Sequence, residues 1–128
     1  MLQLDDAATI KGRPLMTDSD NGQAPEQPPV IRPMEPNERI IRANGVDLCV
    51  QTFGDSADPP ILLIMGGASS MDWWEDGFCE RLMAGSRFVV RYDHRDTGRS
   101  VSYEPGAAPY SLRDLAEDAV GLLDAFGL

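Results

Sequence analysis

The stretch Ile61-Leu62-Leu63-Ile64-Met65 decides the fold class, because it is an unbroken apolar run between a Pro-Pro step at 59–60 and a Gly-Gly step at 66–67. Five apolar residues have the length of a strand, and a continuous run is typical of a strand buried on both faces of a sheet. A second run of this kind, RFVVRY, covers residues 87–92. The sequence therefore predicts two buried strands.

The residues between these two strands, 73–83, have a helical pattern in which Trp74, Phe78 and Leu82 recur at every fourth position. Gly85 follows and is well placed to end the helix. A strand, a crossover helix and a second strand form a right-handed unit with parallel strands. We therefore expect the two buried strands to run parallel.

An antiparallel hairpin is predicted before this unit. Its strands cover residues 39–43 and 46–53, and Asn44-Gly45 between them is a strong signal for a two-residue turn. The predicted fold class is α/β, with an antiparallel hairpin leading into a mostly parallel sheet flanked by helices.

A long loop over residues 93–109 and a second helix are predicted after the unit. Ser111 is the expected N-cap of this helix, Asp114 favours its first turn, and Gly127 is its expected C-terminal cap. The helix has an apolar stripe formed by Leu112, Leu115, Ala119, Leu122 and Phe126.

Composition divides the chain near residue 36. Residues 1–36 hold six of the ten prolines and no aromatic residue. Such a segment buries too little apolar surface to offset the entropy of ordering it. The sequence therefore predicts a disordered, Pro-rich acidic tail over 1–36 and one folded domain over 37–128.

The charge balance argues against several classes of partner. The chain has 11 Lys and Arg against 21 Asp and Glu, a formal net charge of −10, which disfavours nucleic acid and anionic membrane surfaces. No apolar run approaches the roughly 20 residues that cross a bilayer, and no secretory signal is recognisable. We expect a cytoplasmic protein in which Cys49 and Cys79 are buried thiols outside any disulfide.

Two loops that follow the buried strands hold the candidate functional residues. In the first, 65–70, Gly66 and Gly67 can present backbone N–H groups to an oxyanion or phosphate, or they can form a plain tight turn. A serine in this loop, Ser69 or Ser70, is a candidate nucleophile, but 67–71 lacks the second glycine of the G-x-S-x-G turn.

The second loop, Asp93–Ser100, packs two acids, two arginines and the only histidine of the chain into eight residues. In a catalytic interpretation, His94 is a base oriented by Asp93 or Asp96. In the structural interpretation, which the spacing favours, the loop is folded on itself and ion-paired through Arg95.

The stretches 61–67 and 91–100 together resemble the N-terminal part of the α/β-hydrolase superfamily. The second stretch is similar to the D-x-R-G-x-G-x-S loop of that superfamily, with Asp96 where glycine is usual. Its D-H-R-D-T-G-R-S form resembles aclacinomycin methylesterase-type esterases of small molecules. The first stretch resembles the oxyanion loop, with Met65 in place of histidine.

This resemblance implies a role for each matched residue. The Gly67 N–H would stabilise an oxyanion, and Gly66 would let the loop turn. A structural loop motif would consist of Asp93, Arg95, Gly98 and Ser100. Trp73 and Trp74 would either border a substrate pocket or pack the start of a helix on the core.

The resemblance also implies that the nucleophile, the acid and the base of a Ser-Asp-His mechanism lie in segments that this chain does not contain. We therefore expect a truncated hydrolase whose full-length form hydrolyses carboxylic esters of small molecules. This chain alone is expected to be inactive. No metal or organic cofactor is implied.

Two alternatives stay open at this point, and a third is disfavoured. The chain could be a fragment of an epoxide hydrolase or dehalogenase, which share the superfamily fold. It could be a non-catalytic module that binds a partner, or a second copy, through an exposed sheet edge. A nucleotide-binding domain is disfavoured, because 66–71 does not match G-x-G-x-x-G.

Overall fold

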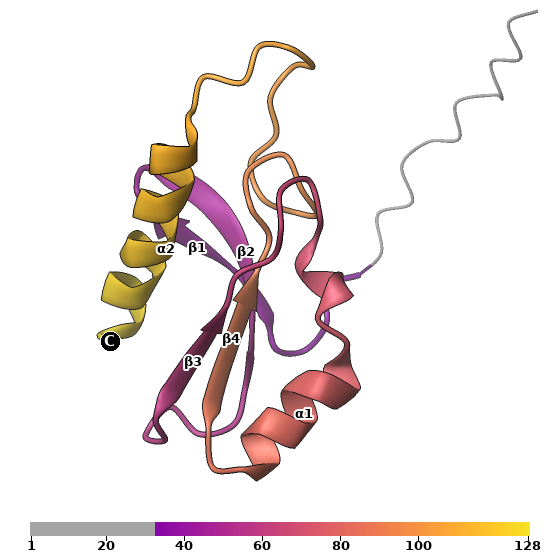
Figure 1. The fold of residues 1–128 in the computed structure, drawn as a ribbon, viewed down its shortest axis with the longest axis vertical. Helices are drawn as coiled ribbons and strands as arrows, with labels where there is room; N and C mark the ends of the chain where they lie inside the picture. The colour runs from indigo at the N-terminus through magenta and orange to yellow at the C-terminus, as the bar shows by residue number, and fades with distance from the viewer. Residues whose placement is uncertain (1–32) are drawn as a thin grey trace, which may run out of the picture. The chain divides into compact units, whose positions relative to one another are not determined.

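Four strands form one mixed sheet in a computed structural model, which describes residues 33–128 (Figure 1). The order of the strands is β1-β2-β4-β3. The tail predicted for 1–36 lies, except for its last four residues, outside the described residues.

The hairpin is confirmed. Strand β1 (Glu38–Ala43) pairs antiparallel with β2 (Val46–Phe53). Asn44 and Gly45 between them have φ angles of 47° and 76°, and two consecutive positive φ angles are what a type I′ hairpin turn requires. Two adjacent residues in the sequence therefore set the register of this pair of strands.

The two apolar runs form β3 (Pro60–Leu63) and β4 (Phe88–Tyr92), which pair in parallel as predicted. The sheet is mixed rather than mostly parallel, because β2 pairs antiparallel with the other side of β4. Every residue of β4 is buried, whereas β3 lies at the edge of the described sheet. The prediction of burial on both faces is therefore wrong for β3, where Ile61 and Leu62 are only partly buried.

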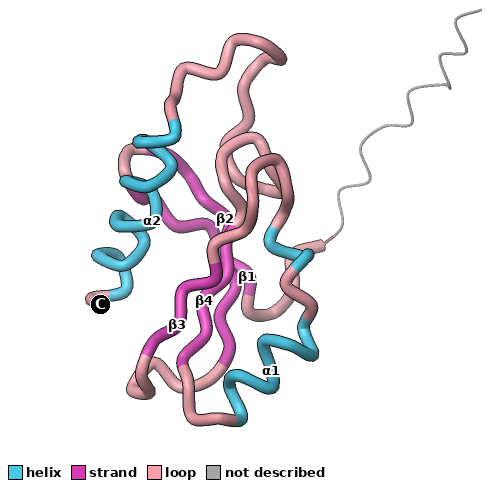
Figure 2. Tube along the Cα trace, viewed as in Figure 1, coloured by secondary structure: helices cyan, strands magenta, loops and turns pink. Residues whose placement is uncertain are grey.

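The two helices cover opposite faces of the sheet (Figures 1 and 2). Side chains of a strand alternate between its two faces. In β4, Val89 packs in a cluster with Cys79 of α1 (Asp76–Ala84), and Val90 packs in a cluster with Leu122 of α2 (Leu112–Phe126). The prediction of helices flanking the sheet is confirmed.

Helix α1 begins later than predicted, and its buried face is different. Residues Met71–Trp73 form a short 3-10 helix, η1, and the chain breaks at Trp74 before α1 starts. Cys79 is fully buried while Phe78 is 41% exposed, and Trp74 and Leu82 of the predicted stripe pack against the cluster that contains Cys79. Gly85 follows the last residue of α1, as predicted, but the left-handed φ of 57° belongs to Ser86.

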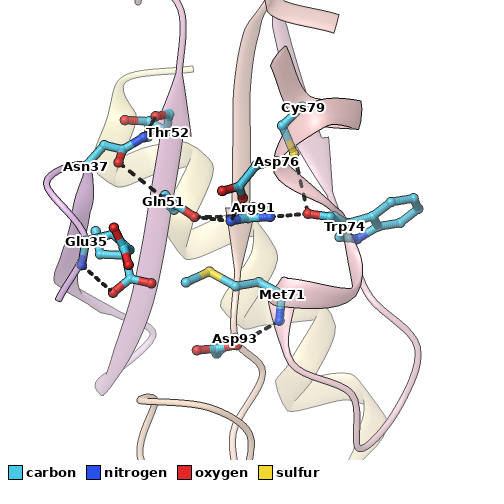
Figure 3. Close-up of polar contacts among 11 residues, drawn as sticks. Glu35, Asn37, Gln51, Thr52, Met71, Trp74, Asp76, Cys79, Arg91 and Asp93 are labelled. Carbon is cyan, nitrogen blue, oxygen red and sulfur yellow. Dashed lines mark hydrogen bonds and ion pairs between the residues drawn. The ribbon is translucent and has the colours of Figure 1, made fainter. Parts of the chain in front are cut away.

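A buried arginine ties the start of α1 to the sheet (Figure 3). Arg91 of β4 donates to Gln51 of β2 at 2.8 Å, to the Trp74 carbonyl and to the carboxylate of Asp76. These contacts give the buried guanidinium polar partners from β2, from the segment before α1 and from α1 itself. A buried charge is stable only when it is paired and hydrogen-bonded in this way. The same contacts fix the position at which α1 begins.

Helix α2 has the predicted caps. The Asp114 carboxylate accepts from both the N–H and the hydroxyl of Ser111 at 2.7 Å, and Gly127 is left-handed with a φ of 72°. The predicted apolar stripe is only partly correct. Leu122 is fully buried, but Leu112 is 82% exposed because the first turn of the helix lies at the rim of a cleft.

Both cysteines, Cys49 and Cys79, are buried, as expected. Among residues 33–128, no helix is long and apolar enough to cross a membrane. Within the same range, no cluster of three or more His, Cys, Asp or Glu side chains is arranged to hold a metal ion.

Candidate functional site

A mostly apolar cleft of about 270 Å³ lies where the chain leaves β3 and β4, next to α2. In α/β sheets, ligands bind at the carboxyl ends of the strands. The cleft is lined by Ile64, Met65, Gly67, Tyr92, His94, Leu112, Leu115, Ala116 and Ala119. Both loops that the sequence singled out therefore contribute to one cleft.

The loop after β3 presents an unpaired donor to this cleft. The Gly66 carbonyl accepts from the Ser69 N–H at 3.3 Å, and Ala68 has a φ of 61° within this turn. The Gly67 N–H donates to none of the described residues. A Cβ atom at Gly66 or Gly67 would meet nothing within 4 Å. Neither glycine is thus required by packing within the described chain, and the space in front of the loop is open.

The imidazole of His94 is hydrogen-bonded to this same loop. Its Nε2 atom lies 2.8 Å from the carbonyl oxygen of Met65, and its Nδ1 atom is buried without a partner. No hydrogen bond joins the ring to the hydroxyl of Ser69 or Ser70 in the described residues. The structure therefore does not bring together the base and nucleophile that the catalytic interpretation requires.

Asp93 links the loop after β3 to the loop after β4 (Figure 3). Its Oδ1 atom accepts from the Met71 N–H at 2.8 Å, and its Oδ2 atom accepts from the Arg99 N–H at 3.0 Å. The backbone of Gly98 lies against this carboxylate. Gly98 has a φ of 48°, and a Cβ atom there would fall 2.0 Å from Oδ2.

Ser100 joins the same loop to the hairpin. Its hydroxyl donates to the Asp93 carbonyl at 2.6 Å and accepts from the Cys49 N–H of β2 at 2.9 Å. Of the residues matched to the structural loop motif, Ser100 bonds the Asp93 carbonyl and Gly98 packs against the Asp93 carboxylate, whereas Arg95 bonds a different partner.

Arg95 forms a buried, bidentate ion pair with Asp118 of α2, with both hydrogen bonds at 2.7 Å. Asn44 of the hairpin turn also donates to Asp118, at 2.8 Å. The Asp118 carboxylate raises the pKa of Arg95 further above its ordinary value. Sequence reasoning missed Asp118, although a carboxylate three residues after Leu115, on the apolar stripe, was a usable signal for a buried cation nearby.

Asp96, which stands where the resembled motif has glycine, has a φ of 62°. Its carboxylate accepts from the Tyr103 N–H at 2.7 Å and from the Tyr110 hydroxyl at 2.6 Å. These hydrogen bonds hold the pKa of Asp96 below its ordinary value. Asp96 therefore fastens the long loop between β4 and α2, and among the described residues its carboxylate makes no hydrogen bond with the His94 ring.

The two tryptophans lie elsewhere. Trp73 is 71% exposed and lines a shallow depression with Ser70, Asp72 and Glu75. Trp74 is half-buried and stacks on Phe78 at 5.5 Å between ring centroids, against the cluster beneath α1. Neither ring lines the cleft that contains Gly67.

Comparison with known proteins gives relatives that include methylesterases and putative carbamate hydrolases. No family model matches the chain. Over 88 residues, 69% of the chain, it is 50% identical to rhodomycin D methylesterase DauP of Streptomyces sp. strain C5. Over the same length it is 48% identical to rhodomycin D methylesterase DnrP of Streptomyces peucetius. The alignment covers 30% of each methylesterase, so the chain spans about a third of the length of these relatives.

Solved structures agree on the fold. Epoxide hydrolase A from Mycobacterium thermoresistibile matches 70% of the chain with a TM-score of 0.62 and 30% identity, over 28% of its own length. An N-formylmaleamic acid deformylase from Pseudomonas putida matches 69% of the chain with a TM-score of 0.56 and 32% identity, over 32% of its own length.

The fold and the two linked loops define the N-terminal portion of an α/β-hydrolase, as the sequence resemblance predicted. Within that class, the chain is related to the methylesterases.

Proposed function

We propose that this chain supplies the oxyanion-binding part of a hydrolase that cleaves carboxylic esters of small molecules, with the Gly67 N–H as a donor. The observation that carries the proposal is an unpaired N–H at an apolar cleft, in a chain related to methylesterases. A preorganised donor stabilises the charge that develops on the carbonyl oxygen as a nucleophile attacks.

The lining of the cleft suits an ester of this kind. Leu112, Leu115 and Ala116 of α2 offer apolar surface to the body of a substrate, while Gly67 offers a polar contact to its carbonyl group. Such a division, with an apolar wall and few polar groups, is usual for small-molecule sites.

The rest of the mechanism requires groups beyond those described. A serine whose proton passes to a histidine attacks the ester carbonyl, while Gly67 and the N–H after that serine hold the oxyanion. The C–O bond to the alcohol then breaks and the alcohol leaves with that proton, and water hydrolyses the acyl-serine to release the acid and restore the serine. Since His94 bonds the Met65 carbonyl and no serine, we expect the 128-residue chain by itself to hydrolyse no ester.

A chimera tests the proposal. The chain is joined to the part of rhodomycin D methylesterase DnrP that follows the aligned region, and hydrolysis of a methyl ester is measured. Gly67→Pro removes the N–H, so kcat is expected to fall about 100- to 1000-fold. Gly67→Ala, which keeps the N–H and adds a Cβ in open space, is the matched control and is expected to retain much more of kcat.

Equal kcat for the proline variant and the unaltered chimera would remove Gly67 from the oxyanion site. Ester turnover by the 128-residue chain alone, lost on Ser69→Ala or Ser70→Ala, would contradict the proposed division of the site.

An epoxide hydrolase is the second candidate, because a solved epoxide hydrolase shares the fold at 30% identity. The higher identity to the methylesterases favours the ester. The sequence Met65-Gly66-Gly67-Ala68 also lacks the proline that the resembled epoxide hydrolases often have in this loop. Hydrolysis of an epoxide, but not an ester, by the chimera would reverse this order.

A further inference from the structure

The loop that carries Gly67 is held at both ends by two consecutive residues. The Asp93 carboxylate accepts from the Met71 N–H, and His94 binds the Met65 carbonyl, each at 2.8 Å. The turn between these anchors has one longer hydrogen bond, 3.3 Å, from the Ser69 N–H. The ends are therefore held more closely than the middle.

The bond from His94 has one possible polarity. A carbonyl oxygen only accepts hydrogen bonds, so Nε2 of His94 carries the proton and donates it to Met65. The other ring nitrogen, Nδ1, is buried and has no hydrogen-bond partner among the described residues. The ring, 6% exposed, also packs edge-on against Tyr92, with 5.0 Å between ring centroids. The imidazole is thus fixed on more than one side.

We propose that His94 is a positioning residue for the oxyanion donor, an inference that rests on the proposed function of Gly67. The peptide group between Met65 and Gly66 is planar, so holding its oxygen also fixes the direction of the Gly66 N–H and the orientation from which the backbone continues to Gly67. Two consecutive glycines give the following backbone wide freedom, and an anchor immediately before them removes much of it. His94 then acts on the reaction through Gly67 and does not act as a base.

The single histidine of the chain makes a direct test feasible by NMR on the 128-residue protein. In ¹⁵N-labelled protein, we expect the Nε2 proton of His94 to be directly visible, because a hydrogen-bonded ring proton exchanges slowly with water. An Nε2 proton that exchanges too fast to be seen would overturn the proposal.

Two substitutions complete the test. His94→Leu removes the donor, and we expect the amide signals of Gly66 and Gly67 to shift and broaden. His94→Gln supplies an amide donor at the same end of the side chain, and we expect it to restore both signals toward their original positions. If His94→Leu does not fold, the ring proton and the glutamine variant still decide the question.

Thr97→Val is the matched control, because it also removes one side-chain hydrogen bond within this loop, 2.9 Å long, but leaves Met65 untouched. It is expected to leave the signals of Gly66 and Gly67 in place. Equal shifts in the leucine and glutamine variants, or in the valine control, would overturn the proposal. None of these measurements depends on turnover. The proposal for His94 can therefore be refuted while the proposed ester hydrolysis is supported, and ester hydrolysis can be refuted while the proposal for His94 is supported.

Discussion

Gly98 differs from Gly66 and Gly67 in its backbone conformation and in the space around it. Gly98 adopts a left-handed conformation against the Asp93 carboxylate, where no side chain fits. Gly66 and Gly67 face open space, without either constraint. Gly98 is therefore required by the packing of the folded chain, whereas Gly66 and Gly67 leave room for a bound molecule.

Gly98→Ala is expected to destabilise the protein by about 2–4 kcal/mol, since it combines a left-handed non-glycine residue with a clash in a packed site. Urea unfolding measures the change. Gly66→Ala is the control and is expected to change stability by less than about 1 kcal/mol, because its Cβ meets nothing. Similar losses in the two variants would contradict this distinction.

At the scale of elements, the caps and the hairpin turn could be predicted from the sequence because neighbouring residues form them. Asn44 and Gly45 make their own turn, and Ser111 bonds Asp114 three positions away. The burial of β3 could not be predicted in this way. The burial of β3 depends on its place at the edge of the sheet. An apolar run of this length has the same sequence pattern in a central strand and in an edge strand.

Asp114 gives α2 a pH dependence. Hydrogen bonds from the backbone and hydroxyl of Ser111 lower the pKa of Asp114 below 3.8. The cap therefore contributes its full stability above pH 3.8 and loses it as the pH falls through the lowered pKa. The protection of the α2 amides against hydrogen exchange, relative to the intrinsic rate at each pH, is expected to fall over this range. Asp114→Asn should show less of this fall, and an unchanged pH dependence of protection in that variant would count against the cap.

The ion pair between Arg95 and Asp118 joins the loop after β4 to α2. Arg95→Met is expected to cost about 3–5 kcal/mol, because it leaves the Asp118 carboxylate buried without its main partner. The double variant Arg95→Met with Asp118→Leu is expected to recover much of this loss. Urea unfolding of the single and double variants measures the coupling, and additive losses would show that the pair acts as two independent groups.

At the scale of the whole molecule, Tyr92 lies in the cluster between α2 and the sheet. Burial raises the pKa of Tyr92 from 10.0 to about 12, and the Asp118 carboxylate adds to the rise. As the pH rises, the unfolded chain loses this proton at a lower pH than the folded protein does. The contribution of Tyr92 to the free energy of unfolding is therefore intact below pH 10 and falls by about 3 kcal/mol as the pH rises to 12.

Tyr92→Phe is expected to abolish this alkaline loss. It should cost little at pH 7, because the Tyr92 hydroxyl has no partner to lose. Urea unfolding at pH 7 and pH 11 measures both effects. Tyr103→Phe serves as the control and should keep the alkaline loss. A Tyr92→Phe variant as alkali-sensitive as the original protein would contradict the assignment.

The candidate site shows the same division between local and distant information. The sequence makes Gly67 a candidate, because two glycines directly follow a strand and resemble the oxyanion loop. The partner of His94 lies 29 positions away, and that of Arg95 lies 23 away. No spacing rule connects such positions, so the local pattern left open whether His94 is a base. The structure shows the ring bonded to the Met65 carbonyl.

The two anchors on the glycine loop have a consequence for protein engineering. Asp93 is hydrogen-bonded to Met71, and His94 is hydrogen-bonded to Met65. The glycine loop and the segment 93–100 should therefore be moved between proteins together. A glycine loop grafted from another hydrolase would arrive without the groups that shape it. Grafts and recombination libraries that exchange both segments together should therefore retain function more often than those that separate them.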